Sequence, residues 1–277
     1  MKLISPKILY TFSNAFEYRE TRNYPIIAIC DDINSYVIKH NRSKTPCNGL
    51  AIELIAHYFL KIWNLNTPNI AVVHVHPEHL NTLEIIQIQE AFFKLPCFGS
   101  VFHKDANEFN QFYTSIQSYE KNKFANKNDF FKLALFDIWL SNEDRTENNP
   151  NFLIHPYAGQ YHVVAIDNES CFNSGNLNSK LSPLTFEDSI LYHKGIKHIV
   201  GKSGFKSENL ESIVEEMYLC IAECKSKADD ILSFIPDEWQ IDISTFKQMF
   251  ADNLFNDDWI SACKNTFFEH VNSALNQ

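Results

Sequence analysis

The sequence predicts an α+β fold in two lobes, a β-rich N-terminal lobe over residues 1–104 and a mainly helical C-terminal lobe over residues 105–277. Two observations predict it. Runs of β-branched and apolar residues concentrate in the first hundred residues, and helix-like patterns dominate the rest of the chain. Because strands and helices are segregated along the chain, an α+β architecture is favoured over an alternating α/β one.

The N-terminal lobe opens with a predicted hairpin. Residues 26–30 and 36–40 are two β-rich runs, separated by five polar residues that suit a connecting loop. Asn48 is a plausible N-cap for a helix with an apolar stripe, which ends before Pro68. A further strand is predicted over residues 69–76.

The later elements follow from similar signals. Residues 83–95 fit either a strand or a short helix, and the Cys-Phe-Gly-Ser sequence at 97–100 predicts a turn. Helices are predicted over residues 105–119 and 128–140, the second being the strongest in the chain, and the polar segment 174–188 predicts a long loop. Four further helices are predicted, over residues 207–224, 227–234, 243–254 and 257–275.

The composition, 45% hydrophobic and 21% charged, is that of an ordinary globular protein. The formal net charge of -10 argues against nucleic acid as the main partner, because phosphate binding needs clustered Lys and Arg. The seven cysteines are scattered, so we expect reduced, mostly buried thiols of a cytoplasmic protein. Pro6 and Lys7 interrupt the only apolar stretch that could begin a signal peptide, and no run approaches the ~18 apolar residues of a membrane span.

The pattern with the most chemistry is an acid- and amide-rich loop, residues 141–151, between the helix at 128–140 and a strand-like Phe-Leu-Ile run. Asp144 in this loop is the candidate that orients an acceptor hydroxyl for phosphoryl transfer. Asp167 follows the next strand-like run and is a candidate metal ligand. Asn149 has the kinase-loop spacing from Asp144 and Asn151 directly precedes the strand, so either could be the second ligand. The alternative is that these residues only stabilise turns of the loop.

A second candidate group lies in the N-terminal lobe. Lys39 ends a Tyr-Val-Ile-Lys strand and could reach the α- and β-phosphates of a nucleotide, while Val37 on the same face could cover the adenine. Glu53, about one turn into the following helix, could pair with Lys39 and position it. Taken alone, Lys39 could equally extend to water and Glu53 could simply favour the helix dipole.

Together these residues resemble the HipA-like serine/threonine kinases, in particular their short, compact branch. The resemblance covers about residues 20–175, and it depends on the order and spacing of several short motifs. These are Tyr36-Val37-Ile38-Lys39, Glu53-Leu54-Ile55-Ala56, Asn66-Thr67-Pro68, Cys97-Phe98-Gly99-Ser100, Phe136 to Arg145, Asn149 to Leu153 and Ala165-Ile166-Asp167.

The resemblance implies a two-lobed protein-kinase-like fold, ATP and Mg²⁺ as cofactors, and a protein hydroxyl as acceptor. Relatives act as toxins against aminoacyl-tRNA synthetases and are held by a DNA-binding antitoxin, so a protein substrate and an antitoxin partner are implied too. One departure is clear: residues 20–25 contain no Gly where relatives have a Gly/Ser-rich phosphate loop, and Arg22 could supply a charged contact instead. A small-molecule kinase and a catalytically silent binding module are the alternative functions.

Overall fold

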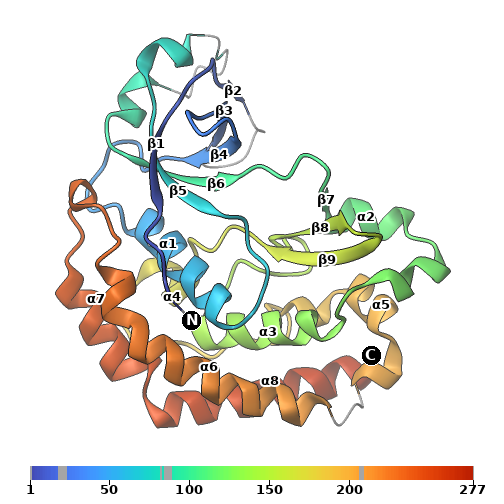
Figure 1. The fold of residues 1–277 in the computed structure, drawn as a ribbon. Helices are drawn as coiled ribbons and strands as arrows, with labels where there is room; N and C mark the ends of the chain where they lie inside the picture. The colour runs from blue at the N-terminus through green and yellow to red at the C-terminus, as the bar shows by residue number, and fades with distance from the viewer. Residues whose placement is uncertain (1, 18–23, 82, 84–88, 206–208, 277) are drawn as a thin grey trace. The chain divides into compact units, whose positions relative to one another are not determined.

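The computed structural model describes residues 2–17, 24–81, 83, 89–205 and 209–276 (Figure 1), and the chain divides into two compact units. The first unit comprises Met1–Tyr58, Pro68–Lys104 and Asp229–Asp242, and the second comprises Phe59–Thr67, Asp105–Ala228 and Ile243–Gln277. Most strands belong to the first unit and most helices to the second. The predicted α+β class, with a β-rich N-terminal region and a helical C-terminal region, is therefore confirmed.

The first unit is built on one six-stranded sheet with the strand order β1-β5-β6-β4-β3-β2. Its strands are β1 (Lys7–Tyr10), β2 (Phe16–Glu17), β3 (Ile26–Ile29), β4 (Ser35–Lys39), β5 (Ile70–His74) and β6 (Cys97–Val101). β1 pairs with β5 in parallel, and all other pairs are antiparallel. The predicted hairpin, now β3 and β4, and the strand predicted over 69–76, now β5, are confirmed.

The two faces of this sheet have different roles because successive side chains of a strand point to opposite sides. Tyr36 and Ile38 of β4 are buried in a hydrophobic core with residues of β1, β3, β5 and β6. Two short 3-10 helices, η1 (Pro77–Leu80) and η2 (Glu90–Phe93), add one buried side chain each to this core. Val37 and Lys39 alternate with the core residues and therefore lie on the opposite face.

The segment predicted as a turn at 97–100 is instead strand β6, which lies between β5 and β4. Gly99 is used here for close packing. A Cβ atom at this position would lie 2.6 Å from Cγ2 of Val73 and 3.4 Å from Cδ1 of Tyr36. The prediction was wrong because a glycine inside a strand, where a neighbouring chain approaches closely, produces the same local signal as a glycine in a turn.

The predicted helix after the hairpin is α1 (Asn48–Ile62). Its first intrahelical bond runs from the amide of Ala51 to the carbonyl of Cys47, so Cys47 takes the cap position predicted for Asn48. Asn64 adopts the left-handed conformation just beyond the helix, which is a common way for a helix to end.

The second unit combines helices with a three-stranded antiparallel sheet of order β7-β8-β9. The strands are β7 (Asn107–Glu108), β8 (Phe152–Tyr157) and β9 (Gln160–Ala165). The main helices are α2 (Phe109–Ser115), α3 (Asn128–Leu140), α5 (Lys194–Phe205), α6 (Asn209–Leu232), α7 (Ile243–Met249), which continues as a π-helix over Phe250–Leu254, and α8 (Asp257–Asn276); α4 (Cys171–Gly175) is a single short turn.

The helix α3 has the predicted bounds and forms the centre of the second unit. All of its side chains except that of Asn128 are buried, and it packs along α8. Two indole groups tie this region together: Nε1 of Trp139 donates to the carbonyl of Leu254 at 3.1 Å, and Nε1 of Trp259 donates to the carbonyl of Trp139 at 3.1 Å. A buried apolar helix of this kind holds the loop that follows it in a defined place.

Three helix predictions need correction. The helix predicted over 105–119 is interrupted, with β7 before the shorter α2. One helix, α6, replaces the two predicted over 207–224 and 227–234, because the polar residues Lys225 and Ser226 are exposed and the Ser226 hydroxyl donates to the carbonyl of Glu223 at 2.8 Å. The helix α5 was not predicted, since its three glycines lower helix propensity. Within the described residues, no helix is both long and apolar enough to cross a membrane.

Candidate active site

In the first unit, Lys39 at the end of β4 forms an ion pair with Glu53 of α1. The Nζ atom of Lys39 donates to Oε1 of Glu53, and the two side chains are 16% and 3% exposed. A carboxylate this deeply buried needs a positive partner, because a buried charge without one costs about 3–5 kcal/mol. The structure therefore brings together the two residues predicted to hold phosphates and to position the lysine, with Val37 on the same face of β4.

In the second unit, the acidic loop (residues 141–151) begins where α3 ends, and it holds Asp144 between two asparagines. The Oδ2 atom of Asp144 accepts a hydrogen bond from Nδ2 of Asn149 and another from Nδ2 of Asn151, each at 2.9 Å. Asp144 itself is half-buried. Both asparagines point their amide N–H groups at Asp144, so their amide oxygens are left for other contacts.

Asp167 follows β9 by two residues and has a left-handed backbone conformation, with φ of 55°. Such a conformation is uncommon for a residue other than glycine, and backbone strain of this kind clusters at functional sites. The register of the sheet pairs Phe152 with Ala165, and the amide of Ile166 donates to the carbonyl of Asn151 at 3.0 Å. Asn151 and Asp167 therefore occupy the adjoining ends of β8 and β9.

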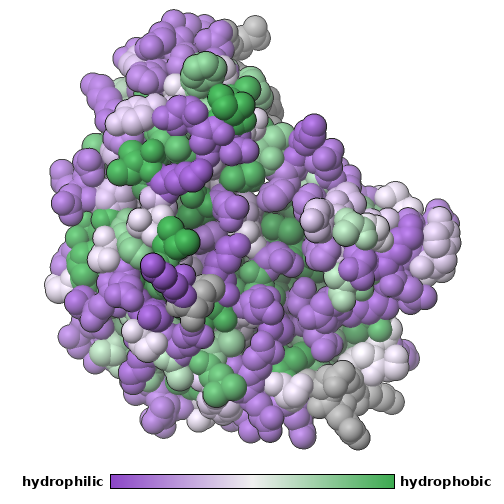
Figure 2. All heavy atoms as spheres, viewed as in Figure 1, coloured by the Kyte–Doolittle hydropathy of each residue, from purple (hydrophilic) through white to green (hydrophobic). Residues whose placement is uncertain are grey.

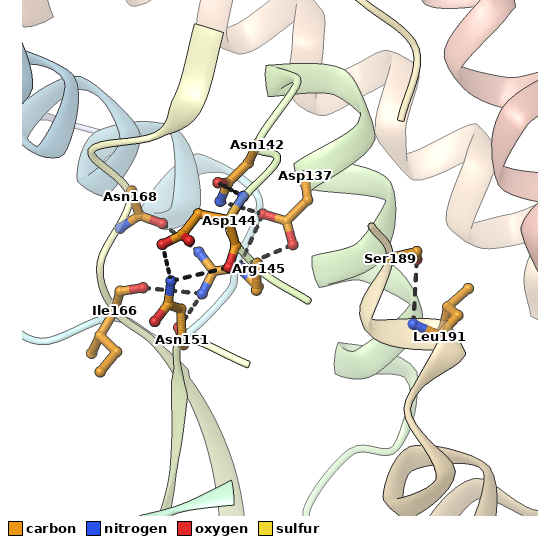
Figure 3. Close-up of polar contacts among 9 residues, drawn as sticks. All are labelled: Asp137, Asn142, Asp144, Arg145, Asn151, Ile166, Asn168, Ser189 and Leu191. Carbon is orange, nitrogen blue, oxygen red and sulfur yellow. Dashed lines mark hydrogen bonds and ion pairs between the residues drawn. The ribbon is translucent and has the colours of Figure 1, made fainter. Parts of the chain in front are cut away.

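A buried arginine that the sequence did not predict, Arg145, connects these parts (Figure 3). Its Nε lies 3.0 Å from each carboxylate oxygen of Asp137. Its Nη1 donates to the carbonyls of Asn151 and of Ile166, the latter at 3.0 Å, and its Nη2 donates to Oδ1 of Asn168 at 2.6 Å. One guanidinium group thus joins the helix before Asp144, the start of β8 and the chain on both sides of Asp167.

The counter-charge for this arginine is Asp137, whose side chain is 3% exposed inside α3. Nδ2 of Asn142 also donates to it, at 3.0 Å. Burial raises the pKa of Asp137 to about 6, and the adjacent Arg145 opposes that rise. An acid within the apolar C-terminal half of α3 was a sequence signal that could have found Asp137, because such a group is costly to bury without a partner. No comparable signal existed for Arg145.

One predicted site residue cannot be placed. Arg22, which was expected to contact the nucleotide phosphates, belongs to residues 18–23, which lie outside the described residues. Its role stays a prediction.

Comparison with known families gives the class of this protein. A model of the HipA-like kinase family matches residues 17–270. The match covers most of the chain, so this protein belongs to the HipA-like kinase family. A search of curated proteins found no match.

Comparison with solved structures bears on the fold. The proinflammatory kinase CtkA of Helicobacter pylori superimposes with a TM-score of 0.53 at 15% sequence identity, over 94% of this chain and 97% of that one. A chain of the Shewanella oneidensis MR-1 toxin–antitoxin system, a complex of HipA, HipB and operator DNA, gives a TM-score of 0.43 at 10% identity, over 95% of this chain and 65% of that one. At this identity the likeness to CtkA supports a shared fold.

Proposed function

We propose that this HipA-like kinase transfers the γ-phosphoryl group of ATP, with Mg²⁺, to a serine or threonine hydroxyl of a protein. Membership of the family supports the reaction type. The observation that carries the detailed proposal is the geometry of Asp144, whose carboxylate is held by two asparagine side chains beside the strand end that leads to Asp167.

Asp144 would orient the acceptor hydroxyl. Both asparagine hydrogen bonds go to Oδ2, and within the described residues no hydrogen bond reaches Oδ1. That second oxygen is therefore placed to accept the proton of an incoming hydroxyl. Positioning of the nucleophile by a fixed carboxylate is the role of the loop aspartate in protein kinases.

The residues present fit a magnesium ion. Mg²⁺ prefers oxygen ligands from carboxylates and amides, and Asp167 and the two asparagines supply that donor set. We favour Asn151 over Asn149 as the ligand that acts with Asp167, because the hydrogen bond from Ile166 to Asn151 joins the two strand ends. When bound, the metal would neutralise phosphate charge.

Residues of the first unit have their own part in the proposal. Lys39, held by Glu53, would contact the α- and β-phosphates, and Val37 would cover the adenine; Arg22 would add a charged phosphate contact. The family resemblance also supports a toxin-type role and an antitoxin partner, and the free, buried cysteines support a cytoplasmic location; all three belong to the same proposal.

Two variants test the reaction. In Asp144→Asn, nucleotide binding should survive while phosphoryl transfer from labelled ATP to proteins of a cell extract falls at least ~100-fold. The matched control is Glu143→Gln, at the exposed neighbour in the same loop. If Asp144→Asn retains full transfer, the acidic loop does not orient the acceptor.

The second variant, Asp167→Ala, tests nucleotide binding directly. ATP with Mg²⁺ should raise the thermal unfolding temperature of the wild type. The expected stabilisation is about 2.7 kcal/mol at a ligand concentration a hundredfold above Kd. Asp167→Ala should lose most of this effect. A wild type that millimolar ATP and Mg²⁺ do not stabilise would refute the proposed function.

A further inference from the structure

A cluster of basic side chains lies on the second unit, although the protein carries a net charge of -10. Lys194, Lys197 and His198 share one side of α5, at helical spacings of three and four residues. Lys121 of the 3-10 helix at Ser118–Lys123 reaches the same side, with its Nζ 3.2 Å from Nδ1 of His198. Lys127 is close to Lys121. We call these five residues the basic ridge.

The positive charge of the basic ridge is poorly compensated. Within the described residues, Lys121, Lys127 and Lys194 form no ion pair with a carboxylate. Burial lowers the pKa of Lys127, and the neighbouring Lys121 lowers it further. Burial also lowers the pKa of Lys197; Glu147 opposes that effect and Lys194 adds to it. Lys121 and Lys127 therefore repel each other, as do Lys194 and Lys197, so ion pairing among the described residues does not explain the grouping of Lys121, Lys127 and Lys194.

Helix α5 strengthens this conclusion. Lys194 is its first residue, and no acidic residue occupies its first turn. The N-terminal end of a helix carries a partial positive charge, which favours acids and disfavours lysines. Lys194, which is exposed, therefore occupies a helix position that disfavours lysine. Residues that depart from such local preferences are expected where they serve function.

The basic ridge lies near the acidic loop within the same unit. Phe109 of α2 packs against His193, directly before α5, with ring centres 4.8 Å apart, and against Phe152, directly after the acidic loop, with ring centres 4.7 Å apart. The carboxylate of Glu147, three residues after Asp144, opposes the burial that lowers the pKa of His193 and of Lys197. The ammonium group of Lys197 also sits over two aromatic rings, 5.6 Å from the centre of Phe186 and 5.5 Å from that of Tyr192. These contacts connect the ridge to the segment that runs from Asp167 to α5.

The start of α5 is held firmly. Nδ1 of His193 accepts a hydrogen bond from the amide of Gly195 at 2.8 Å, so its Nε2 carries the proton and donates to Oδ1 of Asn110 in α2 at 2.7 Å. Ser189 and Leu191, just before this histidine, lie in the same close-up as the acidic loop (Figure 3). Figure 2 shows a mainly hydrophilic surface around α2.

We propose that the basic ridge binds an acidic stretch of the protein substrate, so that a hydroxyl flanked by Asp or Glu is presented to Asp144. This inference rests on the proposed function and names its substrate class. Charge complementarity supports it, because Lys121, Lys127 and Lys194, which form no ion pair with a carboxylate among the described residues, match carboxylates along an extended peptide.

The test measures binding without nucleotide, by fluorescence anisotropy at low salt. Two labelled peptides of equal length each carry one serine, flanked by glutamates in one and by glutamines in the other. The wild type should bind the glutamate peptide more tightly, and added salt should weaken that binding. The double variant Lys121→Ala/Lys194→Ala should lose roughly 2- to 30-fold in affinity for it, the range for two exposed ion pairs.

The matched control is Lys225→Ala/Lys264→Ala, which removes the same charge from exposed positions of α6 and α8 and should bind like the wild type. Equal affinity of the wild type for the two peptides would overturn the proposal, as would equal losses in the two double variants. A single-stranded oligonucleotide that binds more tightly than the glutamate peptide, and depends on the same lysines, would show that the occupant is nucleic acid instead.

Transfer kinetics complete the test. In the ridge variant the KM for the glutamate peptide should rise by the same factor as the loss in binding, with kcat unchanged, because a docking contact contributes equally to the ground state and the transition state. Failure of the proposed function is recognised separately, by the absence of stabilisation with ATP and Mg²⁺. A peptide preference that persists without that stabilisation supports the surface but refutes the kinase reaction.

Discussion

The buried guanidinium of Arg145 allows a sharp test of how the acidic loop is held. Arg145→Met would remove the donor that the carboxylate of Asp137, the carbonyls of Asn151 and Ile166 and the amide oxygen of Asn168 share. Asp137 would keep the hydrogen bond from Asn142, and the carbonyl of Asn151 would keep that from Ile166. Loss of one partner of a buried ion pair costs about 3–5 kcal/mol, and each further unsatisfied acceptor costs about 1–3 kcal/mol. We expect a loss of at least ~4 kcal/mol, which is a large part of a typical domain stability of ~5–15 kcal/mol.

A second substitution separates the ion pair from its surroundings. Asp137→Asn keeps an acceptor for the amide of Asn142 but removes the charge, so the double variant Asp137→Asn/Arg145→Met contains no unpaired buried ion. It should be at least ~2 kcal/mol more stable than Arg145→Met alone, because buried ion pairs can often be replaced by neutral groups at little cost. Urea unfolding, followed by the fluorescence of the buried Trp63 and Trp139, measures both free energies.

The pH dependence gives an independent check. Burial raises the pKa of Asp137 to about 6 even with Arg145 beside it, so the pKa should be higher still in Arg145→Met. The folded state then binds more protons than the unfolded state, and stability falls as pH rises. Arg145→Met should be more stable at pH 5 than at pH 7.5, relative to the wild type, and the double variant should not. The reasoning would be refuted if the losses of unfolding free energy in Asp137→Asn and Arg145→Met simply added in the double variant. It would also be refuted if Arg145→Met alone were within ~1 kcal/mol of the wild type.

Three further predictions concern the first unit. Lys39→Ala and Glu53→Ala should each abolish most phosphoryl transfer. The double variant should transfer little less than either single variant, because the two residues act as one group. Additive losses in the transfer rate would count against this. Burial lowers the pKa of His40 from 6.5 to about 4, so between these two pH values the unfolded chain binds more protons than the folded one. His40 should therefore cost up to about 3 kcal/mol of folding stability as the pH falls from 6.5 to 4. Urea unfolding midpoints at pH 7 and 4.5 measure this loss, and in His40→Gln the contribution of this residue should be absent. Gly99→Ala should cost about 1–3 kcal/mol in thermal unfolding, and adding Val73→Ala should recover part of it; a double variant no more stable than Gly99→Ala would contradict this.

Local sequence was sufficient wherever a pattern is complete within a few neighbouring residues. The hairpin of β3 and β4 follows from two β-rich runs around a polar loop, and α3 was predicted with its observed bounds because its apolar residues and first-turn Asp129 lie within one segment. The order of Asp144, the asparagines and Asp167 was also visible, since a chemical motif on a loop and the adjoining strands is local in sequence. These features need no knowledge of what packs against them.

Only the tertiary structure decided what depends on residues far apart in the chain. Gly99 is needed because the side chain of Val73 packs against it. An arginine on a polar loop is usually exposed. Arg145 is buried because acceptors from α3, from the start of β8 and from the end of β9 converge on its guanidinium. The contact of Lys121 with His198 likewise joins segments 77 residues apart. Such contacts form only when folding brings distant groups together, because the free energy that buries or exposes a charged side chain comes from its neighbours in space.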